Sequence, residues 1–232
     1  MSHRRILSAV DAALVVEFDE VIDPVVNARV VALAGRPRER AAAGVIDVVA
    51  TFRAVTLYID PLVADVDALS ALVQELAALP DDAPGQAEAA IVDIPVCYGG
   101  SFGPDLDDVA RATGLDTADV IAAHTSREYR VFMLGFLPGF AYLGSVDPRI
   151  AVPRHTTPRL HVPAGSVGLA GEQTGVYPSE SPGGWSLIGR TPMRMVDVLR
   201  SQPALLQPGD RVRFHAVNRL EFERLLAAGQ GA

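Results

Sequence analysis

Glycine and proline crowd one part of this chain, residues 129–192, and limit what it can fold into. Of the 20 glycines, 14 lie between Gly99 and Gly189. Glycine permits positive φ and close approach of backbone to backbone, whereas proline fixes φ and removes an amide donor. Such frequent interruption excludes a layer of long helices and predicts short strands joined by shaped loops. We therefore expect the working surface of the protein in this stretch.

The segments beyond residue 100 have the pattern of a strand-rich domain. Two short helices are predicted first, and the strands that follow them are 129–134, a run around 150–153, 167–170, 185–189 and 211–217. The helices are expected over 105–112 and 117–124. The spacing and turns of the strands predict a closed or nearly closed β-barrel. Asn218 and Glu221 have the spacing of a capping box, which predicts a final helix to about Ala228.

The first part of the chain alternates strands and helices. The predicted strands are 12–18, 45–51, 55–60 and 90–98, and the predicted helices are 25–34, which ends at Gly35 before Pro37, and 65–79. Their order, β-α-β-β-α-β, is the split βαβ or ferredoxin-like arrangement. We expect an α+β protein with a ferredoxin-like domain over residues 1–88 and a β-barrel domain over 89–232.

The distribution of charge supports two domains and excludes some partners. Residues 1–90 hold 7 Arg and 14 acidic residues, a net charge of −7, whereas residues 91–232 hold 13 Arg and 14 acidic residues, a net charge of −1. The total of −8 argues against nucleic acid or an anionic membrane as the main partner.

Two absences narrow the chemistry further. All 20 basic residues are Arg, so the chain has no P-loop lysine, no Schiff-base lysine and no lysine to carry biotin. The single Cys97 excludes a disulfide framework and a cysteine-based zinc site, and we expect no metal site. No apolar run is long enough to span a membrane. Asp11, Glu17 and Asp19 interrupt the N-terminal apolar residues, so we expect a cytoplasmic protein without a signal peptide.

Several residues are candidates for chemistry, each with an ordinary structural alternative. His124 ends a predicted helix, where it either transfers protons or only interacts with the helix dipole. Arg154, Arg159 and Arg190 stand beside proline or glycine loops, and arginine suits carboxylate or phosphate, although most arginines are simply solvated. His155 and His161 do not have metal-ligand spacing.

The glycine-rich and aromatic residues are equally open to two interpretations. The run from Ser181 through Gly183 and Gly184 to Trp185 either donates backbone N–H groups to an anion or makes a tight turn before a strand. The aromatic side chains either line an apolar pocket or fill a barrel; they are Phe136, Phe140, Tyr142, Tyr177 and Trp185.

Four phrases of the sequence together resemble one family. They are VCYGGSFGPDLDDVA, HTSREYRVFMLGFLPGFAYLG, TPRLHVPAGSVGLAGEQTGVYP and SPGGWSLIGRTP. They are similar to the family that comprises the B subunit of 5-oxoprolinase, the sporulation kinase inhibitor KipI and allophanate hydrolase subunit 1. The resemblance covers nearly the whole chain and is strongest over residues 96–192. One departure lies in the run Pro178-Ser179-Glu180-Ser181, which has serine where the common form of the motif has leucine.

The resemblance implies a cyclophilin-like β-barrel at the C-terminal end and partner proteins, the A and C subunits. It implies that the three proteins open 5-oxoproline to glutamate at the expense of ATP, whose site is not assigned to this chain, and that the chain alone is inactive. The catalytic candidates are then His124, Arg154, Arg159 and Arg190, with substrate-binding candidates Phe136, Gln173, Tyr177, Ser181, Gly183, Gly184 and Trp185. A KipI-like inhibitor of a sensor histidine kinase and a component of urea or allophanate metabolism are the alternatives.

Overall fold

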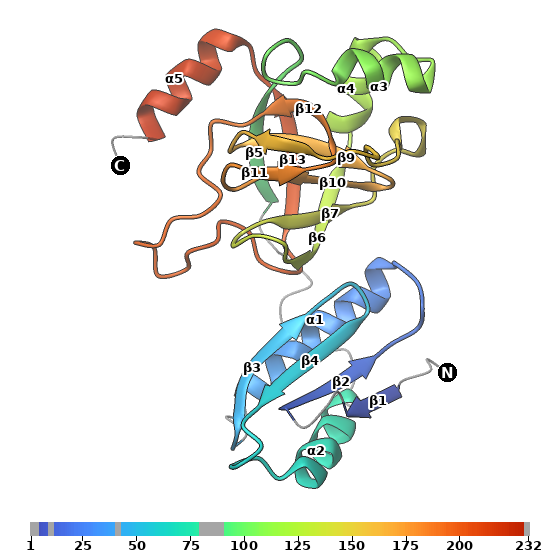
Figure 1. Ribbon diagram of the computed structural model, residues 1–232, viewed down its shortest axis with the longest axis vertical. Helices are drawn as coiled ribbons and strands as arrows, with labels where there is room; N and C mark the ends of the chain where they lie inside the picture. The colour runs from blue at the N-terminus through green and yellow to red at the C-terminus, as the bar shows by residue number, and fades with distance from the viewer. Residues whose placement is uncertain (1–4, 9–11, 40–42, 79–90, 230–232) are drawn as a thin grey trace. The chain divides into compact units, whose positions relative to one another are not determined.

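The computed structural model of the chain describes residues 5–8, 12–39, 43–78 and 91–229 (Figure 1). The chain divides into two units, Met1–Ala89 and Ala90–Ala232. The elements of the first unit are β1 (Arg5–Ser8), β2 (Ala13–Glu17), α1 (Pro24–Glu39), β3 (Val45–Ala50), β4 (Ala54–Ile59) and α2 (Val66–Ala78).

The strands of the first unit form an antiparallel sheet in the order β1-β2-β4-β3. Alternate residues of β2 and β4 point into the core, as Leu14, Val16 and Leu57 do, because side chains on a strand alternate between its two faces. Helix α2 adds Leu69 and Val73, four residues apart on one face. The short break between the predicted strands 45–51 and 55–60 is compatible with a hairpin, and β3 and β4 form one. Helix α2 is capped by the Asp65 carboxylate, which accepts the Ala68 N–H at 3.0 Å.

The ferredoxin-like order predicted for this unit was wrong at its last strand. Strand β5 (Ile91–Tyr98) was assigned to the N-terminal sheet, but it lies in the barrel of the second unit. The fourth strand of the N-terminal sheet is β1, which pairs with β2 at the edge that a strand after α2 would otherwise occupy. The split βαβ core remains, since β4 lies between β2 and β3.

The predicted end of the first helix was also wrong. Helix α1 continues through Gly35 and Pro37 to Glu39. Gly35 does not adopt the positive φ of a C-terminal cap, and Pro37 lies in the last turn of the helix. The sequence DDAPGQ also predicts a turn or linker over residues 81–86, which lie outside the described residues.

The second unit is built on a barrel with short helices around it. Its elements after β5 are α3 (Leu106–Thr113), α4 (Thr117–Thr125), β6 (Glu128–Leu134), β7 (Ala141–Gly144), the 3₁₀ turn η2 (Pro148–Ile150), β8 (Arg159–Val162), β9 (Ser166–Ala170), β10 (Gln173–Val176), β11 (Ser181–Gly183), β12 (Ser186–Arg190), β13 (Arg211–Ala216) and α5 (Arg219–Gly229).

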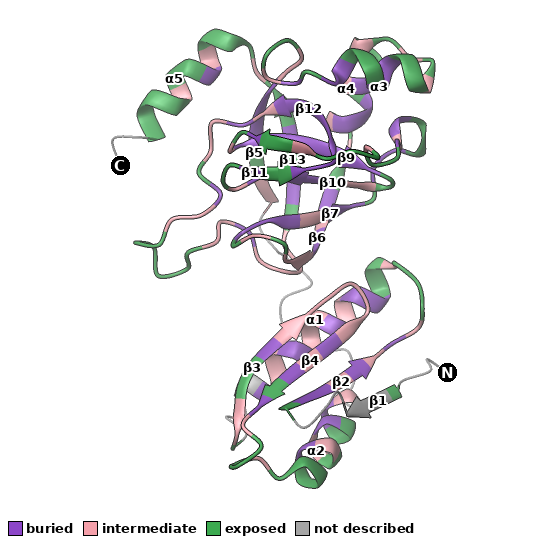
Figure 2. Ribbon diagram, viewed as in Figure 1, coloured by how far each residue is buried: buried purple, intermediate pink, exposed green. Residues whose placement is uncertain are grey.

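Seven strands close the barrel in the order β10-β7-β6-β13-β5-β12-β9, with β9 pairing back to β10. Strand β13 runs parallel to β5 and antiparallel to β6, so the barrel is mixed. Helix α3 contacts β12, and helix α4 contacts β13. Every residue of β9 is buried, and Figure 2 shows the buried barrel strands in contrast to the largely exposed α5. Strands β8 and β11 form a separate ribbon.

The predicted barrel and its two helices are confirmed, with differences in the loops. Gly114 ends α3 at φ 71°, and the Asp116 carboxylate caps α4 by accepting the Asp119 N–H at 2.7 Å. The Asn218 side chain caps α5 by accepting the Glu221 N–H at 2.9 Å. The predicted strand around 150–153 is reduced to one isolated antiparallel bridge between Val152 and Gly171. It is preceded by the turn η2, which Asp147 caps because its side chain accepts the Arg149 N–H. Four strands of the second unit were not individually predicted, namely β7, β8, β10 and β11.

Candidate functional site

Most of the predicted site residues meet at one cavity of the second unit. The cavity has a volume of about 580 Å³ and is lined by Phe136, Phe140, Tyr142, Pro153, Arg154, Pro158, Ala170, Gly171, Gln173, Tyr177, Pro182, Gly183, Gly184 and Trp185. We call it the aromatic pocket. Seven of the eleven predicted residues line it, and they are Phe136, Arg154, Gln173, Tyr177, Gly183, Gly184 and Trp185.

The aromatic side chains of the pocket pack edge to face around Phe140. The centroid of its ring lies 4.9 Å from that of Tyr142, 5.3 Å from that of Tyr177 and 5.3 Å from that of Trp185. Phe140 and Tyr177 are almost completely buried, so these rings are held by packing on all sides. T-shaped contacts of this kind fix the orientation of each ring. The pocket therefore has a rigid apolar floor.

Phe136 differs from the other aromatic residues because it stands at the exposed edge of the pocket. It is 59% exposed, and its backbone has φ 68°, in the left-handed region that a bulky side chain rarely adopts. Its ring makes T-shaped contacts with Phe140 and Tyr177. The short turn around it is held by hydrogen bonds from Leu137 N to Gly135 O at 2.8 Å and from Gly135 N to Phe140 O at 3.1 Å.

Arg154 and Gln173 bring a cation and an amide side chain to the lining of the pocket. Burial raises the pKa of both Tyr142 and Tyr177, and the positive charge of Arg154 opposes that rise in each case. The positive charge of Arg154 therefore acts on the hydroxyl groups of two tyrosines that line the pocket. An arginine beside apolar walls can pair with the carboxylate of a small ligand.

Two glycines let the backbone approach the aromatic side chains closely. A Cβ atom at Gly183 would lie 2.4 Å from the Tyr177 hydroxyl oxygen, so no larger residue fits there without displacement. At Gly184 the nearest atom to such a Cβ would be the His155 carbonyl oxygen, at 3.5 Å. Gly184 is linked to the segment that precedes β8, because its carbonyl oxygen accepts the His155 N–H at 2.8 Å.

Two predicted residues lie next to the pocket without lining it. The Arg159 guanidinium makes an ion pair with the carboxylate of Asp105, which also accepts the Leu187 N–H at 2.6 Å. Ser181 is buried, and its hydroxyl donates to the Pro182 carbonyl oxygen at 3.1 Å. Sequence reasoning did not select Asp105. Its only sequence signal is its place before a helix, which is typical of an ordinary cap.

His124 lies in the interior of the barrel unit and not at the pocket. Its ring has no exposed surface, and its Nδ1 and Nε2 atoms lie 2.8 Å from the Tyr98 hydroxyl and 2.9 Å from the Thr174 hydroxyl. Burial lowers the pKa of His124 from 6.5 to about 3. Because both ring nitrogens have partners and the ring is enclosed, the arrangement fits a neutral histidine that connects α4 to β5 and β10. It gives no route by which His124 transfers a proton to a ligand.

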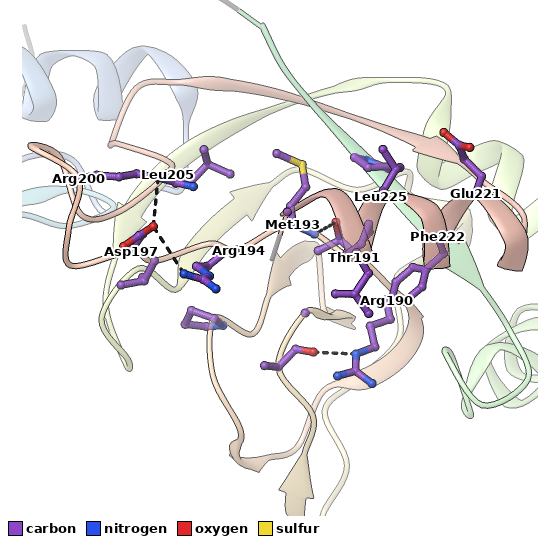
Figure 3. A pocket seen from close by; sticks show the side chains of 18 of the residues that line it. Arg190, Thr191, Met193, Arg194, Asp197, Arg200, Leu205, Glu221, Phe222 and Leu225 are labelled. Atoms are coloured by element: carbon purple, nitrogen blue, oxygen red, sulfur yellow. Dashed lines mark hydrogen bonds and ion pairs between the residues drawn. The ribbon is translucent and has the colours of Figure 1, made fainter. Parts of the chain in front are cut away.

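Arg190 belongs to a second, larger cavity, which we call the α5 groove. Its volume is about 1060 Å³, and its lining includes the segment 190–198 and the buried side of α5 around Phe222 and Leu225 (Figure 3). Arg190 donates from Nε to the Ala164 carbonyl oxygen at 2.7 Å. This groove contains one predicted site residue, whereas the aromatic pocket contains seven, so we take the aromatic pocket as the candidate site.

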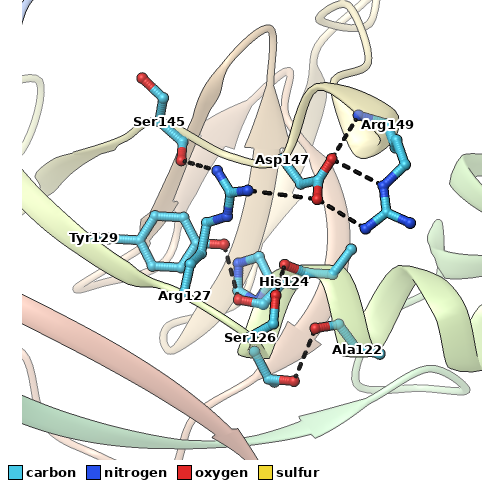
Figure 4. A network of polar contacts seen from close by, with 10 residues as sticks. Ala122, His124, Ser126, Arg127, Tyr129, Ser145, Asp147 and Arg149 are labelled. Atoms are coloured by element: carbon cyan, nitrogen blue, oxygen red, sulfur yellow. Dashed lines mark hydrogen bonds and ion pairs between the residues drawn. The ribbon is translucent and has the colours of Figure 1, made fainter.

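Apart from the two cavities, a cluster of polar side chains lies near the end of α4 (Figure 4). Asp147 accepts two hydrogen bonds from the Arg149 guanidinium and lies 3.4 Å from Arg127. Arg127 also donates to the Ser145 carbonyl oxygen at 3.0 Å. The hydrogen bonds from Arg149 lower the pKa of Asp147 to about 2. The cluster joins the loop after α4 to the loop after β7 and to the turn η2, and none of its residues lines either cavity.

The described residues contain no group of three or more His, Cys, Asp or Glu side chains able to hold a metal ion. Within those same residues, no helix has the length and apolar character needed to cross a membrane.

Comparison with known proteins shows the family to which the chain belongs. The family described as "Carboxyltransferase domain, subdomain C and D" matches residues 4–206. The B subunit of 5-oxoprolinase from Bacillus subtilis (strain 168) is 41% identical over 223 residues, which cover 91% of this chain and 92% of that protein. The B subunit of 5-oxoprolinase from Escherichia coli O157:H7 is 54% identical over 129 residues, 56% of this chain and 59% of that protein.

Among solved structures, that of TTHA0988 superimposes with a TM-score of 0.81 at 38% identity. The match covers 89% of this chain but 40% of TTHA0988. The chain therefore spans less than half of that structure, and the larger part of TTHA0988 has no counterpart here.

Proposed function

The chain belongs to the family of 5-oxoprolinase B subunits, which are carboxyltransferase-related proteins, and from this premise we propose that its aromatic pocket binds 5-oxoproline. The protein is a subunit of 5-oxoprolinase, an ATP-dependent hydrolase. We propose that it acts together with the A and C subunits, which complete the enzyme. The observation that carries the proposal for the pocket is a rigid aromatic cavity with the Arg154 guanidinium at its wall.

The chemistry of 5-oxoproline matches what the pocket offers. This molecule is a five-membered lactam with one carboxylate, so it needs apolar walls for the ring, a cation for the carboxylate and an amide partner for the lactam group. Phe140, Tyr177 and Trp185 supply the walls, Arg154 the cation and Gln173 the amide. Phe136 stands at the edge and covers part of the ligand. The volume of about 580 Å³ holds a molecule of this size.

The reaction requires more charge than this pocket holds. ATP supplies a phosphoryl group, which activates the resonance-stabilised lactam carbonyl towards water. A triphosphate needs several cations or N–H donors. Among the described residues, the lining of the pocket has one guanidinium, since Arg159 is paired with Asp105 and Arg190 lies in the α5 groove. We therefore place no ATP site in the aromatic pocket, and the role of the pocket in our proposal is to bind and orient 5-oxoproline.

Two finer assignments belong to the same proposal. We propose that residues 1–88 and 89–232 are separate domains and that the barrel is of the cyclophilin-like type. The closed mixed barrel and its separation from the N-terminal sheet support both assignments. Because the reaction consumes ATP, we propose a cytoplasmic location.

Substitution of Arg154 tests the proposed pocket. In the enzyme reconstituted from the three subunits, Arg154→Gln should raise the KM for 5-oxoproline about tenfold or more, since a hydrogen bond to a charged group contributes roughly 1.5–3 kcal/mol. The KM for ATP should stay unchanged. Arg111→Gln is the matched control, because Arg111 is exposed on α3 and pairs with Asp108 in the same helix. An unchanged KM for 5-oxoproline in Arg154→Gln would exclude this guanidinium from substrate binding.

A further inference from the structure

The carboxylate of Asp105 is buried and is not used in the way its position suggests. Asp105 immediately precedes α3, where an Asp side chain normally accepts N–H groups of the first helical turn. Here the side chain makes no such cap and is 3% exposed. A buried carboxylate is costly unless charges or hydrogen bonds compensate it. Its partners therefore show what this residue does.

The partners of Asp105 come from two segments that are distant in sequence. Its Oδ2 atom accepts the Leu187 N–H at 2.6 Å, and its own N–H donates to the Leu187 carbonyl oxygen at 2.9 Å. Its Oδ1 atom accepts from the Arg159 guanidinium. The Nε2 atom of His155 lies 3.5 Å from Oδ2 and is buried with no hydrogen-bond partner among the described residues.

These two segments form neighbouring walls of the aromatic pocket. Residues 153, 154 and 158 line one wall, directly beside His155 and Arg159. Residues 182–185 line the other wall, two positions before Leu187. Two sets of backbone contacts join these walls, namely the pairing of β8 with β11, which sets Arg159 opposite Gly183, and the hydrogen bond from His155 N to Gly184 O. Asp105 adds a side-chain link between the same two segments.

We propose that Asp105 is a positioning residue that, together with the β8–β11 pairing, holds these walls in place and thereby sets the placement of Arg154 relative to Trp185. The consequence for catalysis rests on the proposed function of the pocket, whereas the positioning itself does not. Arg159 acts with Asp105 as part of this link and does not contact the substrate. This role depends on charge. The buried carboxylate of Asp105 attracts the guanidinium of Arg159, and because Arg159 begins β8, the ion pair also holds β8 and the preceding loop in place.

Trp185 makes the positioning measurable without any knowledge of the reaction. It is the only tryptophan of the chain, it is 6% exposed, and it lines the pocket. Asp105→Asn keeps an oxygen that can accept the Leu187 N–H but removes the charge that holds Arg159. We expect the fluorescence of Trp185 in this variant to become at least twofold more sensitive to quenching by acrylamide, with an unchanged far-UV circular dichroism spectrum.

Asp108→Asn is the matched control for this measurement. Asp108 lies on the same helix, is 63% exposed and pairs with Arg111, so its substitution should leave the quenching of Trp185 at the wild-type value. Should Asp105→Asn fail to fold, Arg159→Met removes the same charge pair from its half-exposed side and should give the same increase. Wild-type quenching in a folded Asp105→Asn or Arg159→Met variant overturns the proposal.

Steady-state kinetics then separate positioning from loss of structure. In the reconstituted enzyme, Asp105→Asn should raise the KM for 5-oxoproline about tenfold while kcat at saturation changes less than twofold, because the pocket is displaced but not removed. The double variant Asp105→Asn/Arg159→Met should be no worse than Asp105→Asn alone, since both changes break one link. A uniform fall in kcat with unchanged KM would contradict positioning. Altered quenching of Trp185 with an unchanged KM would retain the structural link and refute 5-oxoproline binding in the pocket.

Discussion

The buried His124 predicts a specific loss of stability in weak acid. The Thr174 hydroxyl donates its only hydrogen to the Gly168 carbonyl oxygen at 3.0 Å, so its oxygen accepts from Nε2–H of His124. The Nδ1 atom of His124 then accepts from the Tyr98 hydroxyl. This network fixes the neutral tautomer and turns a donor, the Tyr98 hydroxyl, towards Nδ1. When the pH is lowered, the His124 ring therefore takes up a proton more readily in the unfolded chain than in the folded one.

The magnitude follows from the two pKa values of His124. Burial lowers the pKa from 6.5 to about 3, so between these values the unfolded chain binds a proton that the native chain does not. Stability is then fully present above pH 6.5 and falls as the pH decreases. From pH 7.5 to pH 5.0 the expected loss from this residue is about 2 kcal/mol, and about 4 kcal/mol would be lost by pH 3, at 1.36 kcal/mol per pKa unit.

Urea unfolding followed by circular dichroism measures this loss at pH 7.5, 6.5, 5.5 and 5.0. In His124→Gln the free energy of unfolding should vary much less over the same range, because no titrating ring remains in the interior. His161→Gln is the control, since His161 is 78% exposed, and it should keep the wild-type dependence. If His124→Gln does not fold, the ring nitrogens of His124 in the wild type can be followed by NMR and should not titrate above pH 4. Titration near pH 6.5, or equal pH dependence in wild type and a folded His124→Gln, would refute the reasoning.

Two further predictions concern packing and acid stability. Gly183→Ala places a Cβ atom 2.4 Å from the Tyr177 hydroxyl oxygen and should lower the free energy of unfolding by about 1–3 kcal/mol. Gly184→Ala is the control, because the nearest atom to its Cβ lies at 3.5 Å, and it should change the free energy of unfolding little. Urea unfolding at pH 7.5 distinguishes the two variants. Asp147→Asn should be less stable than wild type at neutral pH, and the difference should close as the pH falls from about 4 to about 2, because hydrogen bonds from Arg149 lower the folded-state pKa of Asp147 from 3.8 to about 2. Urea unfolding followed by circular dichroism across that pH range measures the difference in the free energy of unfolding between the two proteins. A difference that persists undiminished at pH 2 would contradict the pKa assignment.

Local patterns were sufficient to predict the elements whose ends have their own capping groups. The Asp65, Asp116 and Asn218 side chains cap the helices that follow them, and each cap lies within three residues of its partner. The pairing of strands is not local. Strand β5 was placed in the wrong sheet because its partner β13 lies more than 100 residues further along the chain, where Arg213 pairs with Asp93. No periodicity within 90–98 carries that information.

The same distinction applies to the aromatic pocket. Its lining was largely predicted because glycine and aromatic residues gather in one stretch of sequence, as Phe136, Tyr177, Gly183 and Trp185 do. Asp105 was missed because its partners are 54 and 82 residues away and its local sequence is typical of a helix start. For His124, position at a helix end did not reveal that the barrel closes over the ring.

The requirement for this chain in 5-oxoproline hydrolysis is the most direct test of the account. The three subunits are mixed with 5-oxoproline and ATP, and the formation of glutamate is measured with and without this chain. We predict turnover by the complete mixture and none when this chain is omitted. An unchanged rate of glutamate formation without it would contradict its role as an enzyme subunit.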